Sequence, residues 1–181
     1  MLVIVGSSAS GKTKIAEELI KTYHMKKLVT YTTREKRIGE IEGKDYHFIS
    51  REDFIEKIKN NFFIEYVEYN NNYYGTSFSD LSVNKVVILE PQGLSHYLKV
   101  ARELVTIVFL KTSPEVLRIR MLNRGDAYDD VMRRVKNDQL VFNQNVKNLA
   151  DLVVDTTPSN IYHDAEIIYN FYKKRNDLHE R

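Results

Sequence analysis

The chain has 181 residues, 43% of them hydrophobic and 29% charged, which is enough to form one compact domain with a sizeable core. Its 27 basic and 25 acidic residues nearly cancel, and the net charge of +2 excludes the broad charged field that gathers nucleic acid or anionic lipid. The absence of cysteine excludes disulfides, a thiolate nucleophile and cysteine-built zinc sites, and no apolar run approaches the roughly 20 residues of a membrane-spanning helix.

The first apolar run, Leu2–Val5, ends at Gly6. It is short and no basic segment precedes it, so it predicts a buried strand of a parallel sheet rather than a secretory signal, and we expect a cytoplasmic protein. Apolar residues then recur at helical spacing from Lys12 to about Tyr23. The chain is thus predicted to open as a strand, a glycine loop and a helix.

The next segment, residues 30–83, has a different pattern. It predicts a strand near Leu28–Thr32, an extended piece at Tyr46–Ile49, a helix that begins at Ser50-x-x-Asp53, and strands at Phe62–Tyr69 and Tyr73–Thr76 joined by a turn at Asn70–Asn72. These elements indicate a small mixed α+β lobe, inserted into the main fold, in which an acceptor molecule can bind.

Alternating strands and helices return after this lobe. We expect strands at Lys85–Leu89, Val105–Leu110 and Leu152–Val154, with helices running to about Glu103, from Ser113-Pro114 onward, and from about Ser159 to Lys174. This alternation predicts an α/β fold, a doubly wound parallel five-stranded sheet, with a core formed by residues 1–29 and 84–181.

The glycine loop matches the pattern G-x-x-x-x-G-K-[ST] and lies between a predicted strand and a predicted helix. Its backbone N–H groups are expected to face phosphate oxygens at the helix N-terminus, with Lys12 on the outer phosphates of ATP and the Thr13 hydroxyl on Mg²⁺. The predicted ATP-binding residues are Gly6, Ser7, Ser8, Ala9, Ser10, Gly11, Lys12 and Thr13.

The loop alone leaves GTPases, ATPases, motors and small kinases open. The sequence has no N-K-x-D motif, and the strand at 85–89 does not end in D-x-x-G, which disfavours a switch GTPase. The same strand is followed by one carboxylate, Glu90, where a motor ATPase normally needs two. A small-molecule kinase needs less, because its catalysis consists mostly of positioning and charge neutralisation.

The predicted lobe carries three motifs in order. They read Thr30-Tyr-Thr-Thr-Arg34-Glu-Lys-Arg37-Ile-Gly39-Glu40-x-x-Gly43-x-Asp45-Tyr46-His-Phe48, then Phe63-Ile-Glu65, then Tyr73-Tyr74-Gly75-Thr76. In order and spacing they closely resemble the motifs of guanylate kinases, and the resemblance extends over about residues 1 to 155. It implies a single guanylate-kinase-like domain that uses Mg²⁺ and ATP, binds GMP in the lobe, and works as a monomer or homodimer.

The resemblance also assigns the acceptor site. It implies that the GMP phosphate is held by Arg34, Arg37, Tyr46 and Tyr74, and that Thr30, Glu65, Gly75, Thr76 and Glu90 complete the GMP site. Two arginines three residues apart offer planar forks that suit a dianionic phosphate. The alternative is that Arg34 and Arg37 lie on a solvated loop and pair with Glu35 and Glu40.

Glu65 is the predicted reader of the base. Strand alternation places it on the face of Phe63 and Val67, with Glu68 on the opposite face. A carboxylate accepts both N1–H and the N2 amino group of guanine, whereas it repels the N1 lone pair of adenine. The alternative is that Glu65 pairs with a nearby basic side chain.

A helical lid is predicted at about residues 120–137. Arg120 and Arg124, four residues apart, are expected to share a helix face, and Arg134 matches a later lid arginine of guanylate kinases. With Lys12 and Arg34 they form the predicted catalytic set. The alternative is an exposed face in which these arginines pair with Asp126, Asp129 and Asp130, while Arg118 faces water.

The chain departs from the family pattern at several positions. Ala9 stands where the family usually has glycine, Lys36 replaces a proline, and Glu90 stands where the family has two acids. The predicted reaction is phosphoryl transfer from ATP to GMP. A related kinase acting on dGMP or a ribose bisphosphate, or a catalytically silent binding module, is the alternative, although the intact Lys12-Thr13 disfavours the silent module.

Overall fold

The computed structural model describes residues 1–69, 71–89, 91–158 and 160–179. Its core is a parallel sheet of five strands, as predicted, and their order is β2-β7-β1-β8-β9. The strands are β1 (Leu2–Gly6), β2 (Lys26–Lys27), β7 (Lys85–Ile88), β8 (Thr106–Lys111) and β9 (Leu152–Asp155). Every residue of β1 is buried, because both faces of the central strand are covered by helices.

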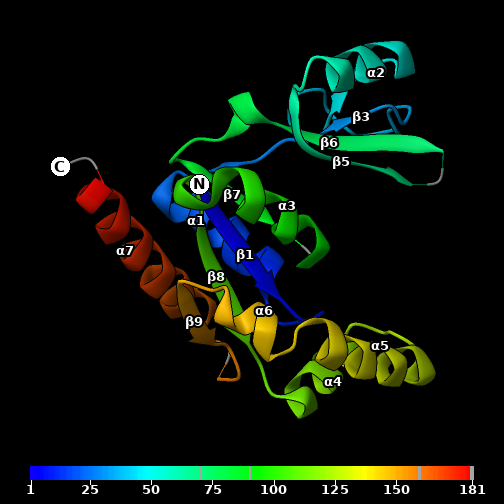
Figure 1. Ribbon diagram of the computed structural model, residues 1–181. Helices are drawn as coiled ribbons and strands as arrows, with labels where there is room; N and C mark the ends of the chain where they lie inside the picture. Colours follow the sequence, from blue (N-terminus) through cyan, green and yellow to red (C-terminus); the bar gives the residue numbers. More distant parts are fainter. Residues whose placement is uncertain (70, 90, 159, 180–181) are drawn as a thin grey trace.

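Helices lie on both sides of this sheet (Figure 1), and a cluster of apolar side chains fills the space on each side. On one face, residues of α1 (Lys12–Tyr23) and α7 (Ile161–His179), among them Leu19 and Ile168, pack against Leu2 and Ile4. On the other face, Leu94 and Tyr97 of α3 (Pro91–Ala101) pack with Val3 and Val5. Short helices, η2 (Arg102–Leu104) and α6 (Gln144–Asn148), complete that side, and α6 was not predicted.

The inserted lobe (residues 30–83) forms a second, mixed sheet in the order β4-β3-β6-β5. Its elements are β3 (Tyr31–Thr32), β4 (His47–Phe48), α2 (Arg51–Lys59), β5 (Phe63–Tyr69), β6 (Asn72–Ser77) and η1 (Phe78–Asp80). The predicted start of α2 is confirmed, since the Ser50 side chain accepts a hydrogen bond from the Asp53 N–H at 3.0 Å. Phe54 of α2 stacks on Phe63 with ring centroids 4.3 Å apart, which fixes the helix on the sheet.

The single strand predicted near Leu28–Thr32 is wrong, because two separate strands take its place. Lys26–Lys27 joins the core sheet beside β7, and Tyr31–Thr32 joins the lobe sheet beside β6. Leu28 lies between them and donates its N–H to the Val86 carbonyl at 3.0 Å. The chain crosses from core to lobe at this point, so one continuous strand cannot serve both sheets.

A second correction concerns β5. The ladder with β6 shifts register between Phe63 and Glu65, so that Phe63 faces Ser77 while Glu65 faces the next residue, Thr76. Phe63 and Glu65 therefore lie on opposite faces, although the alternation predicted a shared face. Glu65 and Val67 do share a face, and Glu68 lies on the other, where its carboxylate pairs with Arg51 at 2.8 Å.

Two helices, α4 (Pro114–Asn123) and α5 (Tyr128–Val141), form an arm that projects from the core on the same side as the inserted lobe (Figure 1). Ser113 caps α4 as predicted, by accepting the Val116 N–H at 3.4 Å. Leu117, Met121 and Val131 form the small apolar seam of the arm. Among the described residues, no helix combines the length and the apolar character needed to cross a bilayer.

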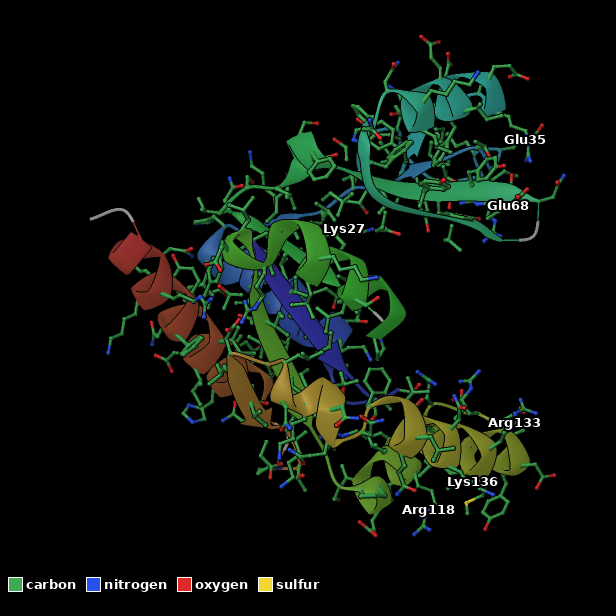
Figure 2. The ribbon with its side chains drawn as sticks, viewed as in Figure 1. Lys27, Glu35, Glu68, Arg118, Arg133 and Lys136 are labelled. Carbon is green, nitrogen blue, oxygen red and sulfur yellow. The ribbon has the colours of Figure 1, made fainter. Side chains whose placement is uncertain are left out.

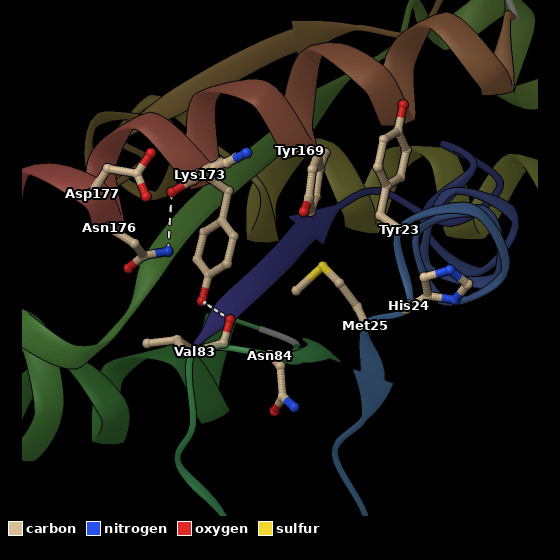
Figure 3. A pocket seen from close by; sticks show the side chains of 10 residues that line it. Tyr23, His24, Met25, Val83, Asn84, Tyr169, Lys173, Asn176 and Asp177 are labelled. Atoms are coloured by element: carbon tan, nitrogen blue, oxygen red, sulfur yellow. Dashed lines mark hydrogen bonds between the residues drawn. The ribbon is translucent and has the colours of Figure 1, made fainter.

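A hollow of about 200 Å³ lies at the C-terminal end of α1, the end remote from the glycine loop. It is lined by the end of α1 and the loop that leads to β2, by the segment that leads from the lobe to β7, and by α7 (Figure 3). The buried Tyr172 of α7 donates its hydroxyl to the Val83 carbonyl at 2.7 Å there. This bond ties α7 to the segment that leads back from the lobe.

Candidate functional site

The glycine loop lies between β1 and α1, as predicted. Gly6 passes so close to β8 that a Cβ at this position would stand 2.8 Å from the Leu110 carbonyl oxygen, which excludes a side chain. Ala9 adopts φ of 63°, the left-handed conformation that glycine usually takes, so the departure noted in the sequence is accommodated at the cost of local strain. Gly11, at φ of 101°, ends the loop as the N-cap of α1.

Lys12 folds back over its own loop. Its ammonium donates to the carbonyls of Gly6 at 2.5 Å and Ser7 at 2.9 Å, and it stands 5.7 Å from the centre of the Phe142 ring. Thr13 follows in the first turn of α1 with its side chain exposed. The lysine and the hydroxyl therefore sit together at the mouth of the loop, where an anion with its cation can be held.

Asp138 is a site residue that the sequence reasoning missed. It belongs to α5, is only 7% exposed, and accepts a hydrogen bond from the Ser8 N–H at 2.5 Å. The spacing of Asp138 offered a signal, because Val131 and Val135 of α5 and Phe142 at its C-cap face inward, and Asp138 falls on the same helical stripe. An acid on an apolar stripe needs a partner, and here the partner is the loop.

Arg120 of α4 lies against the back of the glycine loop. Its guanidinium donates to the Ala9 carbonyl at 3.3 Å and to the Thr156 carbonyl at 2.7 Å. Thr156 in turn donates its hydroxyl to the Ser10 carbonyl at 2.9 Å. Arg120 thus joins the arm, the loop and the end of β9, and it holds the strained Ala9 peptide in place.

Arg124 and Arg134 converge on a different group, the carboxylate of Asp126. Arg134 lies 3.2 Å from it, Arg124 also pairs with it, and both side chains are about half exposed. The hydrogen bond from Arg124 holds the pKa of Asp126 below its usual range. Arg120 and Arg124 therefore do not point at one place in this structure, although their spacing predicted that they would.

The remaining arginines of the arm lie at its outer surface (Figure 2). Arg118 is exposed, as predicted, and Arg133 pairs with Asp130 at 2.7 Å while its own side chain is 76% exposed. Neither contacts the loop.

Arg34 and Arg37 meet the carboxylate of Glu40 in the inserted lobe. The Arg34 guanidinium lies 2.6 Å from Glu40 Oε1, and the Arg37 backbone N–H donates to Oε2 at 2.8 Å. The bond from Arg34 holds the pKa of Glu40 below its usual range. This is the pairing that the alternative reading anticipated for Glu40, and it keeps the Arg34 fork in one orientation beside the lobe sheet.

Two tyrosines stand beside Arg34. The guanidinium lies 5.4 Å from the centre of the Tyr46 ring, and the rings of Tyr46 and Tyr74 are 6.0 Å apart. Tyr74 and Thr76 alternate on β6, so they share the face that carries Glu65. Thr30 is half-buried at the edge of this lobe, and its carbonyl accepts the His47 N–H at 2.9 Å. Arginine, tyrosines and acid thus form one continuous polar face.

The far end of this face is the pair formed by Glu65 and Thr76. The Thr76 hydroxyl donates to Glu65 Oε1 at 2.9 Å, and Thr76 itself is 1% exposed. Gly75 between the tyrosine and the threonine must lack a side chain, because a Cβ would lie 2.9 Å from Phe54 Cζ. Glu90, the last predicted acceptor residue, lies outside the described residues.

The donor set also suits a magnesium ion carried by a nucleotide. Mg²⁺ keeps several waters and takes one or two protein oxygens together with phosphate oxygens. The exposed Thr13 hydroxyl beside Lys12 meets this requirement. Within the described ranges no cluster of three or more histidine or acidic side chains is arranged to hold a metal by itself.

A family model described as guanylate kinase matches residues 1–162. The guanylate kinase of Wolinella succinogenes is 33% identical over 199 aligned positions that cover 97% of this chain and 93% of that protein. The guanylate kinase of Clostridium tetani is 39% identical over 144, covering 76% and 69%.

A solved structure agrees with these matches. The crystal structure of guanylate kinase from Anaplasma phagocytophilum superposes with a TM-score of 0.63 at 28% identity, covering 96% of this chain and 84% of that one.

Proposed function

This chain belongs to the guanylate kinase family, and we propose that it transfers the terminal phosphoryl group of ATP to GMP, giving ADP and GDP. The observation that carries the proposal is the continuous polar face of the inserted lobe. A guanidinium flanked by two tyrosines stands at one end and the Glu65–Thr76 pair at the other, which suits a phosphate and a purine of the same nucleotide.

The base is selected by the Glu65 carboxylate. Guanine offers two adjacent donors, N1–H and N2–H, which one carboxylate accepts together, whereas adenine offers a lone pair at N1. The bond from Thr76 holds Oε1 in place and so orients the whole carboxylate. AMP would leave the Glu65 carboxylate without a donor, and an analogue that leaves such a group unpaired binds poorly.

The acceptor phosphate is held by Arg34, Arg37, Tyr46 and Tyr74, and the ATP phosphates by the loop of residues 6–13. A GMP phosphate oxygen attacks the γ-phosphorus in line, the bond from that phosphorus to the bridging oxygen of ADP breaks, and ADP leaves. Lys12 lies on the outer phosphates, Arg120 holds the loop, and Arg124 and Arg134 meet the charge that spreads over the γ-phosphoryl oxygens. These residues act by position and by charge.

The Thr13 hydroxyl would hold Mg²⁺ together with the nucleotide phosphates, and the ion would neutralise negative charge there. We further propose that residues 1–29 and 84–181 act as the core, residues 30–83 as the GMP-binding lobe and about 120–137 as the lid. The lobe and the arm project from the same side of the core (Figure 1), and their approach would bring the two nucleotides together.

The experiment is a screen of GMP, AMP, CMP and UMP as acceptors with ATP and Mg²⁺, following ADP formation. We expect turnover with GMP far above the others, and a loss of at least about 100-fold in kcat when Lys12→Ala removes the charge from the transferred group. Adding dGMP and a ribose bisphosphate to the screen tests the other acceptors. No ADP from any acceptor at micromolar enzyme would overturn the proposal.

A further inference from the structure

Tyr97 of α3 is a polar residue in an apolar environment. It is fully buried, lies among Val3, Leu94 and Ile107, and ranks among the largest side chains with no exposure. Its hydroxyl has no hydrogen-bond partner among the described residues. A buried hydroxyl without a partner costs free energy, and a phenylalanine would fill the same space without that cost. We therefore expect the Tyr97 hydroxyl to have a function beyond packing.

The position of Tyr97 indicates that role. Helix α3 packs on β5, and Ile64, the residue at the register shift beside Glu65, belongs to the same apolar cluster as Tyr97. The phenol thus lies where the core helix meets β5, near enough to Thr76 and Glu65 for both to affect its pKa. Burial raises the pKa of Tyr97, and the charges of Glu65 and Asp80 add to the rise, so the phenol stays protonated and can donate. The Thr76 hydroxyl lies outside ordinary hydrogen-bonding geometry but near enough to lower this pKa in part.

The geometry points to Tyr97 as a positioning residue for base recognition: when GMP is bound, we propose, its hydroxyl donates to the Thr76 oxygen, which commits the Thr76 proton to the base-reading site. This inference rests on the proposed function. A threonine hydroxyl has one proton and two lone pairs. A donor behind it occupies one lone pair, and the chain of bonds from Tyr97 through Thr76 to Glu65 then runs in a single direction.

The consequence is a link between core and lobe at the base. The Glu65 carboxylate is oriented by Thr76, and Thr76 would be oriented by a residue of the core helix rather than by the lobe alone. Closing of the lobe over GMP would give the Tyr97 hydroxyl its partner. The unpaired hydroxyl then destabilises the unliganded protein, and GMP binding removes this destabilisation by giving the hydroxyl a partner. The bound nucleotide therefore favours the closed form.

Tyr97→Phe tests this directly, because it removes one oxygen and keeps the ring. We expect the KM for GMP to rise about five- to tenfold, the size of one neutral hydrogen bond, with the KM for ATP unchanged. We expect the melting temperature of the unliganded protein to stay level or rise, since an unpaired buried hydroxyl is lost. A gain in stability together with a loss in GMP affinity is a result that a purely structural role does not produce.

Tyr172→Phe is the matched control. Tyr172 is 3% exposed, but its hydroxyl is already paired with the Val83 carbonyl, at the hollow beyond the far end of α1 (Figure 3). Its loss should lower the melting temperature and leave the KM for GMP unchanged. A double-mutant cycle with Thr76→Ala gives a second readout, because Tyr97→Phe should add little once Thr76 has lost its hydroxyl.

The outcomes separate this inference from the proposed function. If the wild-type protein does not phosphorylate GMP, the proposed function fails. If it does, and Tyr97→Phe leaves the KM for GMP unchanged or raises both KM values alike, Tyr97 is a packing residue and the inference is wrong. An equal effect of Tyr97→Phe with and without Thr76 would also overturn it, since the phenol would then not act through Thr76.

Discussion

The contact between Asp138 and the glycine loop leads us to a prediction about ATP binding. The Ser8 N–H donates to the Asp138 carboxylate at 2.5 Å, and a bound phosphate needs the N–H groups of this loop. ATP must therefore displace the carboxylate before it can occupy the loop fully. We expect Asp138→Ala to tighten ATP binding, because the substitution frees the Ser8 N–H, removes a negative charge from the loop and leaves every predicted ATP ligand intact.

The size of the effect follows from the bond that is lost. A hydrogen bond to a charged group contributes about 1.5 to 3 kcal/mol, and about 1.4 kcal/mol corresponds to a factor of ten in affinity. Water takes over the freed N–H in part, so we expect the Kd for ATP to fall about tenfold. Asp138→Asn keeps an oxygen that can accept the N–H without the charge, and its Kd should lie between those of the wild type and the alanine variant.

Calorimetric titration with ADP and with a non-hydrolysable ATP analogue measures this effect, and thermal unfolding of the unliganded protein accompanies it. The melting temperature should fall while nucleotide affinity rises, because the same contact stabilises the empty protein. Asp130→Ala is the control, since Asp130 lies on the same helix but pairs with the exposed Arg133. Unchanged or weaker ATP binding by folded Asp138→Ala would refute the reasoning.

Three further predictions concern single side chains. Arg34→Lys keeps the charge but loses the fork that Glu40 and Tyr46 orient, so steady-state kinetics should show a higher KM for GMP well before any change in the KM for ATP. Glu65→Gln should lose most of the preference for GMP over AMP, read as the ratio of kcat/KM values, with the KM for ATP nearly unchanged. Burial alone would raise the pKa of Asp151, but hydrogen bonds from Arg102 and the Ile107 N–H hold this pKa below its usual range. The ionised carboxylate therefore stabilises the fold in full above about pH 4, the pKa of an unfolded aspartate, and this stabilisation is lost as the pH falls through the lower pKa of the folded protein. Asp151→Asn should therefore cost about 2 kcal/mol in thermal unfolding at pH 7, and its difference from the wild type should shrink at pH 3.

Local patterns predicted the parts of the site that local structure determines. The loop from Gly6 to Thr13 is such a part, because its conformation follows from glycines between a strand and a helix. Ala9, which stands where the family usually has glycine, is the left-handed residue of this loop. The cap at Ser50 is another. The five-stranded sheet followed from buried apolar runs, although the edge strand at Lys26–Lys27 was missed because two exposed lysines give no apolar signal.

Features that depend on partners distant in the sequence were missed. The register shift at Ile64 turns Phe63 toward α2 and Glu65 toward Thr76, and strict alternation cannot anticipate an inserted residue. Arg120 was expected to share a target with Arg124, but the carbonyls of Ala9 and Thr156 lie nearer to it in the folded chain. Asp138 was overlooked because its partner, the Ser8 N–H, precedes it by 130 residues.

Three of the proposed anion-binding elements are occupied by a carboxylate of the chain itself. Asp138 lies on the loop, Glu40 on Arg34 and the Arg37 N–H, and Asp126 on Arg124 and Arg134. Basic groups gathered for phosphates would otherwise repel one another, so substrate binding becomes an exchange of one anion for another. Glu40 and Asp126 lie close in sequence to their arginines, and exchange there is local. We expect exchange at Ser8 to release α5 from the loop, so that ATP binding would change what holds the arm in place.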